Sequence, residues 1–212
     1  MEIERRFYDV TELRIRNDDS GPVIEGYAAV FNKLSEDLGG FREKIRPGAF
    51  RNAIRRTDTI MLFNHDANYP LGRVSAGTLA IKEDKKGLFV SANPPKSAVR
   101  VIEAIERGDV TKMSFGFTTE KDEWQHKKNE SIRTLVEVGQ LPDVGPVVFP
   151  AYPDTTVAVR SLERSKATAP VRTDDPERKA QVLRTDDAPD DKMYWRTQRV
   201  MEEWERKKGG KD

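Results

Sequence analysis

Lys112-Met113-Ser114-Phe115-Gly116-Phe117 has the pattern of a β-strand with one bulky face. Alternate residues of a strand point to opposite sides, so the methionine and the two phenylalanines share a face that predicts core packing. Ser114 and Gly116 share the other face, where the missing side chain of the glycine leaves room for a substrate backbone. This arrangement suits a nucleophilic serine. A serine that only packs or lies at an edge is the alternative that the pattern leaves open.

Strand-like patterns continue on both sides of this segment through the first 160 residues. They lie near residues 3–15, 22–31, 59–65, 71–81, 87–92, 110–119, 131–139 and 144–159. Helical patterns interrupt them at Pro47–Arg55, which begins with proline, and at Ser97–Arg107, which ends before Gly108. Many short strands with few helices predict an antiparallel barrel or sandwich and argue against repeated βαβ units.

The composition changes after residue 160. Residues 161–192 contain no aromatic side chain and carry Asp-Asp pairs and prolines, so they predict a disordered linker. Residues 193–212 predict a short amphipathic helical tail that includes Trp195 and Trp204. An isolated helix of this length is marginal in water, so we expect it to need a partner. The sequence thus predicts one domain over residues 1–160 followed by a tail.

Composition restricts the chemistry of the chain. There is no cysteine, which excludes disulfides, cysteine-ligated zinc and a cysteine nucleophile within this sequence. The 37 basic and 36 acidic residues nearly cancel, so no overall charge favours nucleic acid. No apolar run approaches the length of a membrane span, and the N-terminus is charged, so we expect a soluble intracellular protein. Metal-binding and phosphate-binding motifs are not found either.

The two histidines limit any imidazole-assisted hydrolysis to His65 or His126. His126 lies in a polar segment and is expected to be solvated. His65 ends the apolar run Ile60–Phe63, but strand periodicity puts it on the bulky face and does not place it next to Ser114. Glu137 points away from the core face of its own strand, so it could orient a histidine. A core histidine and a solvated glutamate are the competing interpretations.

Six sequence segments resemble the prohead proteases of tailed bacteriophages, which are distantly similar to herpesvirus assemblins. In chain order the segments are Gly26–Asn32, Glu43–Phe50, Leu62–Asp66, Leu71–Val74, Met113–Phe117 and Glu137–Val138 with Asp143–Asp154. Together they span about residues 20–160. Each segment alone is weak evidence for the family, whereas six segments in the family's order are a specific signal. The resemblance implies a mainly β domain with a closed or nearly closed antiparallel barrel and a few helices.

The resemblance also implies roles for individual residues. Ser114 matches the family's nucleophile and His65 its general base, while Glu137 matches the third member. Asp143 is the second choice for that third role, because it lies six residues further along the same region. The expected type is therefore a Ser-His-Glu triad. Where the family often has serine this chain has Gly145, and the arginine that helps hold the oxyanion in the viral relatives is absent nearby. Backbone N–H groups around Gly145 are the first oxyanion candidates, and Arg73 is the second.

The function implied by the resemblance is a serine endopeptidase that cleaves scaffold and major capsid precursor segments during prohead maturation, and that also cleaves itself. It would act in the host bacterial cytoplasm, inside assembling proheads. No metal or organic cofactor is expected, and neither nucleic acid nor membrane is an expected partner; a homodimer stays open. The alternatives are a non-catalytic capsid-assembly or scaffolding protein on the same barrel, and an esterase or amidase with a small substrate.

Overall fold

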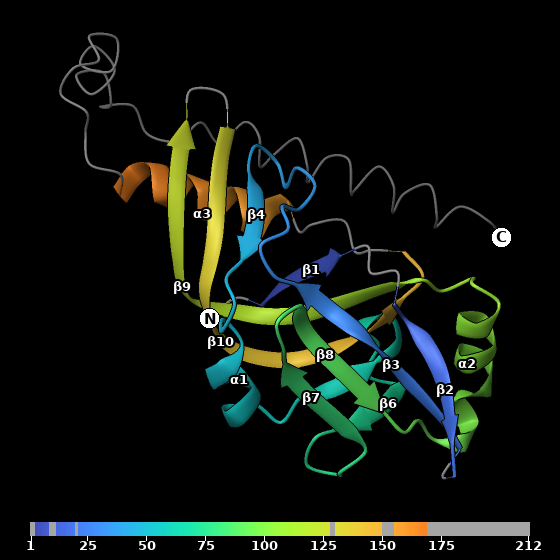
Figure 1. Cartoon of the computed structure of the whole chain (residues 1–212). Helices are drawn as coiled ribbons and strands as arrows, with labels where there is room; N and C mark the ends of the chain where they lie inside the picture. The colour runs from blue at the N-terminus through green and yellow to red at the C-terminus, as the bar shows by residue number, and fades with distance from the viewer. Residues whose placement is uncertain (1–2, 9–11, 20, 128–129, 150–154, 169–212) are drawn as a thin grey trace, which may run out of the picture. The chain divides into compact units, whose positions relative to one another are not determined.

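Strands make up most of the computed structural model, as the sequence pattern predicted (Figure 1). The structure describes residues 3–8, 12–19, 21–127, 130–149 and 155–168. The chain divides into two units, residues 1–168 and 169–212, and all described residues belong to the first. The strands are β1 (Glu4–Tyr8), β2 (Arg14–Asp18), β3 (Gly21–Val30), β4 (Arg42–Ile45), β5 (Ile60–Leu62), β6 (Pro70–Arg73), β7 (Leu79–Glu83), β8 (Gly87–Ala92), β9 (Lys112–Lys127) and β10 (Glu130–Val147). The helices are α1 (Arg51–Arg56), α2 (Val99–Glu106) and α3 (Thr155–Thr168), with short 3₁₀ turns η1 (Phe63–His65) and η2 (Lys96–Ala98).

Two sheets contain all of these strands. The first has the order β1-β9-β10-β5-β6, and β4 joins it by pairing with β10. The second has the order β2-β3-β8-β7. The long strands β9 and β10 form an antiparallel hairpin, whereas β4 and β5 both run parallel to β10. Ser114 therefore lies on a central strand of the first sheet, between β1 and β10.

The main hydrophobic core lies between the two sheets. It combines Leu88 and Val90 of the second sheet with Phe115 and Val144 of the first, all fully buried. Met113, Phe115 and Phe117 are each 0 % exposed, which confirms the predicted bulky face of β9. The outward face of β9 in this part of the sheet carries Ser114 and Gly116.

The expected barrel closure is not found among the described residues. β1 and β6 end the first sheet, β2 and β7 end the second, and neither sheet pairs with itself to close. A closed barrel needs a continuous stagger of all its strands. Here the register of β9 with β10 shifts four times between Leu135 and Asp143, and such irregularities interrupt a regular stagger. The mainly β character is confirmed, but the closed barrel is not.

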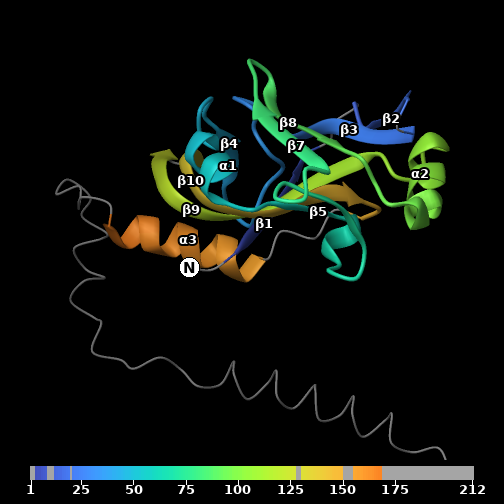
Figure 2. The same cartoon turned by 90° about the horizontal axis from the view of Figure 1, so that it is seen from below.

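Helix α3 crosses the boundary predicted after residue 160. Leu162 is 6 % exposed and packs with Leu38 and Phe41, against which Trp124 also lies. The helix lies on the side of the β9–β10 hairpin away from β3, β7 and β8 (Figure 2). Residues 161–168 of the predicted linker are thus helical, and the rest of that linker and the predicted tail helix lie outside the described residues. None of the described helices is long and apolar enough to cross a membrane.

Candidate active site

Ser114 lies on β9, the middle one of the three adjacent strands β1, β9 and β10. Its Cα partner on β1 is Phe7, and its partner on β10 is Gly145. Although Ser114 points away from the core, the residue is only 1 % exposed. Its position is therefore fixed by strands on both sides, which suits a group that must be held in one geometry.

A left-handed turn brings His65 to this serine. Asn64 and His65 have φ values of 54° and 57°, which take the chain out of the extended path of β5 at η1. Asparagine and histidine are among the residues that tolerate this conformation best. The Asn64 side-chain oxygen accepts a hydrogen bond from the Val148 N–H at 2.9 Å, which holds the turn to the end of β10. The turn explains why strand periodicity alone could not place His65.

Asp143 lies behind the histidine ring. One of its carboxylate oxygens contacts His65 Nδ1, and both side chains are about one-tenth exposed. Asp143 is the Cα partner of Gly116. A Cβ built at Gly116 would lie 2.8 Å from Asp143 Oδ2, so the glycine makes room for this carboxylate. The space beside Gly116, which the sequence pattern assigned to a substrate backbone, is instead occupied by the Asp143 carboxylate.

Together these residues form a continuous chain of hydrogen-bonding groups. His65 Nε2 lies 2.7 Å from Ser114 Oγ, on the ring side opposite to the Asp143 contact. A carboxylate at Nδ1 favours the tautomer whose Nε2 lone pair faces the hydroxyl. Ser114 Oγ also lies 2.9 Å from the Arg6 carbonyl oxygen, so its single proton has two acceptors. The arrangement can remove a proton from Ser114 and stabilise the resulting imidazolium.

Glu137 is not at this site, which corrects the expectation that it orients His65. Its Oε1 accepts a hydrogen bond of 2.6 Å from Asn52 Nδ2 on α1. Glu137 pairs with Lys121, five residues along β9 from Gly116, which corresponds to about 17 Å of strand. The register shifts between Glu137 and Asp143 explain why strand alternation misled, and Asp143, the second choice, takes the position instead.

The two oxyanion candidates have different surroundings. Gly145 is the Cα partner of Ser114, but a Cβ there would overlap the Leu62 carbonyl oxygen. The glycine therefore allows β10 to approach the residue just before η1. Arg73 Nε donates to Asp58 Oδ2 at 2.7 Å, and this exposed pair makes Arg73 a poor oxyanion donor.

His126 lies in a different environment on the outer part of β9. Its Nδ1 is 3.0 Å from Ser131 Oγ, its Nε2 is 3.4 Å from Ser165 Oγ of α3, and its ring stacks on Trp124. No carboxylate contacts His126 among the described residues. This environment explains a packing role and offers no carboxylate to balance the charge of an imidazolium.

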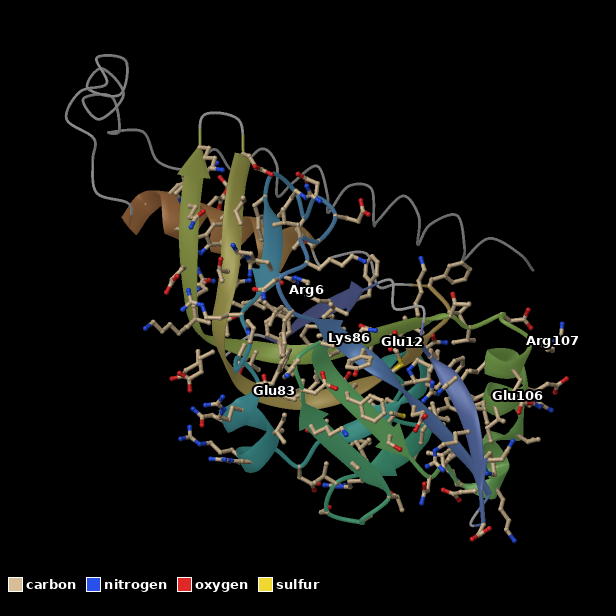
Figure 3. All side chains as sticks on the ribbon, in the orientation of Figure 1. Arg6, Glu12, Glu83, Lys86, Glu106 and Arg107 are labelled. Atoms are coloured by element: carbon tan, nitrogen blue, oxygen red, sulfur yellow. The ribbon has the colours of Figure 1, made fainter. Side chains whose placement is uncertain are left out.

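A buried charge cluster holds β1 beside Ser114. Arg6, which Figure 3 labels, donates to Glu4 at 2.7 Å and to Glu43 at 3.0 Å. Arg133 donates to the same two carboxylates. Burial of Glu4 opposes its ionisation, but the hydrogen bond and charge of Arg133, together with the charge of Arg6, lower its pKa to about 2. Burial likewise opposes the charge of Arg133, but the carboxylates outweigh it and raise the pKa of Arg133. Because every member is paired, loss of any one of them would leave a buried charge without its partner. The cluster thus links β1 to β4 and β10.

Comparison with known proteins supplies an independent finding. The model of the family described as caudovirus prohead serine protease matches residues 9–169. The prohead protease of Enterobacteria phage HK97 is 31 % identical to this chain over 157 residues, which cover 71 % of this chain. The match spans 65 % of the length of that relative. No solved structure matches the chain.

Proposed function

This chain belongs to the caudovirus prohead serine protease family, and we propose that it is a serine endopeptidase of capsid maturation. Its proposed substrates are scaffold segments and the major capsid precursor, with itself as a further substrate. It would act in the host cytoplasm, inside assembling proheads. The observation that carries the proposal is the hydrogen-bonded series Ser114, His65 and Asp143. The relative's name supports the setting, since that protein is a prohead protease.

In the proposed mechanism Ser114 Oγ attacks the scissile carbonyl carbon while His65 Nε2 takes the hydroxyl proton. The imidazolium then donates that proton to the leaving amine, and a second cycle with water releases the acyl group. Asp143 holds the ring in the required tautomer and stabilises its positive charge without taking the proton. None of these steps calls for a metal or organic cofactor.

The hydroxyl must first leave its hydrogen bond with the Arg6 carbonyl. That acceptor competes with His65 for the single proton of Ser114. Because the serine is also 1 % exposed, productive binding requires a small local rearrangement around it. Backbone N–H groups near Gly145 stay the proposed oxyanion donors, since they lie on the strand next to the serine.

Co-expression with the capsid precursor of the same phage tests this function. The wild-type chain should shorten the precursor on a denaturing gel, and mass spectrometry should locate a single cleavage region. Ser114→Ala should abolish the shortening while circular dichroism shows an unchanged fold. Equal processing by the variant would refute the serine mechanism. A folded wild-type chain that leaves the precursor intact would favour a non-catalytic assembly protein.

A further inference from the structure

Arg5 lies on the same face of the sheet as the candidate catalytic residues. It is the Cα partner of Gly116, and Gly116 is in turn the partner of Asp143. Directly paired residues of adjacent antiparallel strands present their side chains to one face. Arg5 is a diagonal neighbour of Ser114, at roughly 7–8 Å between paired positions. Its long side chain therefore begins beside the candidate nucleophile.

The Nε of Arg5 has no hydrogen-bond partner among the described residues. This atom is buried and is the one buried side-chain nitrogen or oxygen without a hydrogen bond in the described part of the chain. The residue as a whole is partly exposed, so a molecule from solution can reach it. A buried donor left without an acceptor destabilises a protein, because it has lost its hydrogen bond to water without gaining another. A buried, unpaired Nε on an arginine beside a candidate active site therefore points to an acceptor that arrives from outside.

Among the described residues, the carboxylates near Arg5 already have partners. Asp143 is about two strand spacings away, roughly 10 Å, and its carboxylate contacts His65. Glu4 and Glu43 lie on the other face of β1, where Arg6 and Arg133 bind them. Neighbouring arginines on β1 thus differ sharply, because Arg6 is fully paired and Arg5 is not.

A second cation adds positive charge to the same face. Lys112 lies two residues before Ser114 on β9, and its Nζ is 5.8 Å from the ring centre of Phe7, the β1 partner of Ser114. On this face Lys112 lies two residues before Ser114, and Arg5 lies opposite Gly116, two residues after it. The serine therefore has a cation on each side along β9. A guanidinium binds a carboxylate through two parallel hydrogen bonds, which makes an acidic side chain its best-matched ligand.

We infer that Arg5 binds an acidic side chain of the substrate close to the scissile bond, and so sets cleavage specificity. The inference rests on the proposed peptidase function. Arg5 precedes residues 9–169, which the family model matches, so family membership alone does not assign it. Its expected effect is on the choice among substrates, whereas a donor to the oxyanion would affect all substrates equally.

Cleavage-site profiling tests the inference across many substrate sequences at once. A peptide library made from a digested bacterial proteome is incubated with each variant, and mass spectrometry identifies the new ends. Wild type should show Asp and Glu enriched at one position near the cut. Arg5→Gln should lose this enrichment, and Arg5→Glu should replace it by Lys and Arg. Arg100→Gln, at an exposed site on α2, should match wild type.

Two quenched fluorescent peptides that differ only by Glu or Gln at the enriched position give the kinetic readout. Wild type should favour the Glu peptide by about tenfold or more in kcat/KM, mainly through KM. Arg5→Gln should bring that ratio close to one, and Arg5→Lys should restore part of it. An unchanged ratio in Arg5→Gln would overturn the inference, as would an equal loss of kcat on both peptides, which indicates an oxyanion role. Cleavage that persists in Ser114→Ala would instead refute the proposed function.

Discussion

His65 and His126 both lie beside a serine, yet their surroundings differ in the feature that catalysis needs. His65 has Ser114 on one ring nitrogen and the Asp143 carboxylate on the other. His126 has serine hydroxyls at both nitrogens and a stacked Trp124. A carboxylate stabilises an imidazolium, whereas two hydroxyls and an indole mainly fix a ring in place. A serine–histidine contact alone is therefore weak evidence for a catalytic unit.

Alanine substitution of each histidine tests most directly whether His65 and His126 differ in catalysis. His65→Ala should lower kcat by about 10⁶-fold, and Ser114→Ala should do the same, because residues that act as one unit are lost together. The double variant should be no worse than either single one. His126→Ala should keep wild-type kcat/KM and lose only some thermal stability, since it removes packing on Trp124. An inactive, folded His126→Ala variant would reverse the assignment of the two histidines.

The acid behind the ring gives the next largest effect. Asp143→Asn should reduce kcat by roughly 10⁴-fold, because an amide favours the wrong tautomer of His65. Glu137→Gln is the matched control: it makes the same chemical change on the same strand, at a residue bound to Asn52. We expect it to leave kcat nearly unchanged. A larger loss of kcat in Glu137→Gln than in Asp143→Asn, measured in steady-state peptide assays, would restore the Ser-His-Glu assignment.

Gly116→Ala tests whether the position of the carboxylate matters. A methyl group there would come 2.8 Å from Asp143 Oδ2, so the carboxylate must shift from its place beside His65. A displacement of this size should cost about 10²-fold in kcat, with a folded protein. Gly108→Ala is a useful contrast, because its positive φ strains the backbone but its Cβ would meet no atom within 4 Å. If both variants kept full kcat, the carboxylate would not depend on this space.

The buried cluster under β1 predicts how the fold, as distinct from the site, responds to acid. The pKa of Glu4 is lowered from 4.5 to about 2, so its ionised form stabilises the fold above pH 4.5 and this contribution is lost as the pH falls toward 2. The shift corresponds to about 3 kcal/mol at neutral pH. Glu4→Gln should lower the free energy of unfolding at pH 7 and flatten its decline in acid. Urea titrations at several pH values measure both, and parallel pH curves for the two proteins would contradict the role of Glu4.

Sequence patterns located the outward face of β9 because strand alternation holds there without interruption. The same rule failed at Glu137, since the register shifts in β10 change which residues lie opposite each other. It also failed at η1, where two consecutive left-handed residues turn His65 toward the serine. Arg5 gave no signal, because its importance depends on the pairing of β1 with β9, more than 100 residues away. Local periodicity thus predicted strands and faces, while bulges, turns and distant pairing required the structure.

Labelling with a fluorophosphonate probe tests the central claim that Ser114 is activated by His65 and Asp143. Such probes react with a serine only when a base increases its nucleophilicity. The folded wild-type protein is incubated with the probe, and peptide mapping locates the adduct. The label should lie on Ser114, persist in His126→Ala and be absent from His65→Ala. A folded wild-type protein that takes up no label, or that carries it on another residue, would contradict the account.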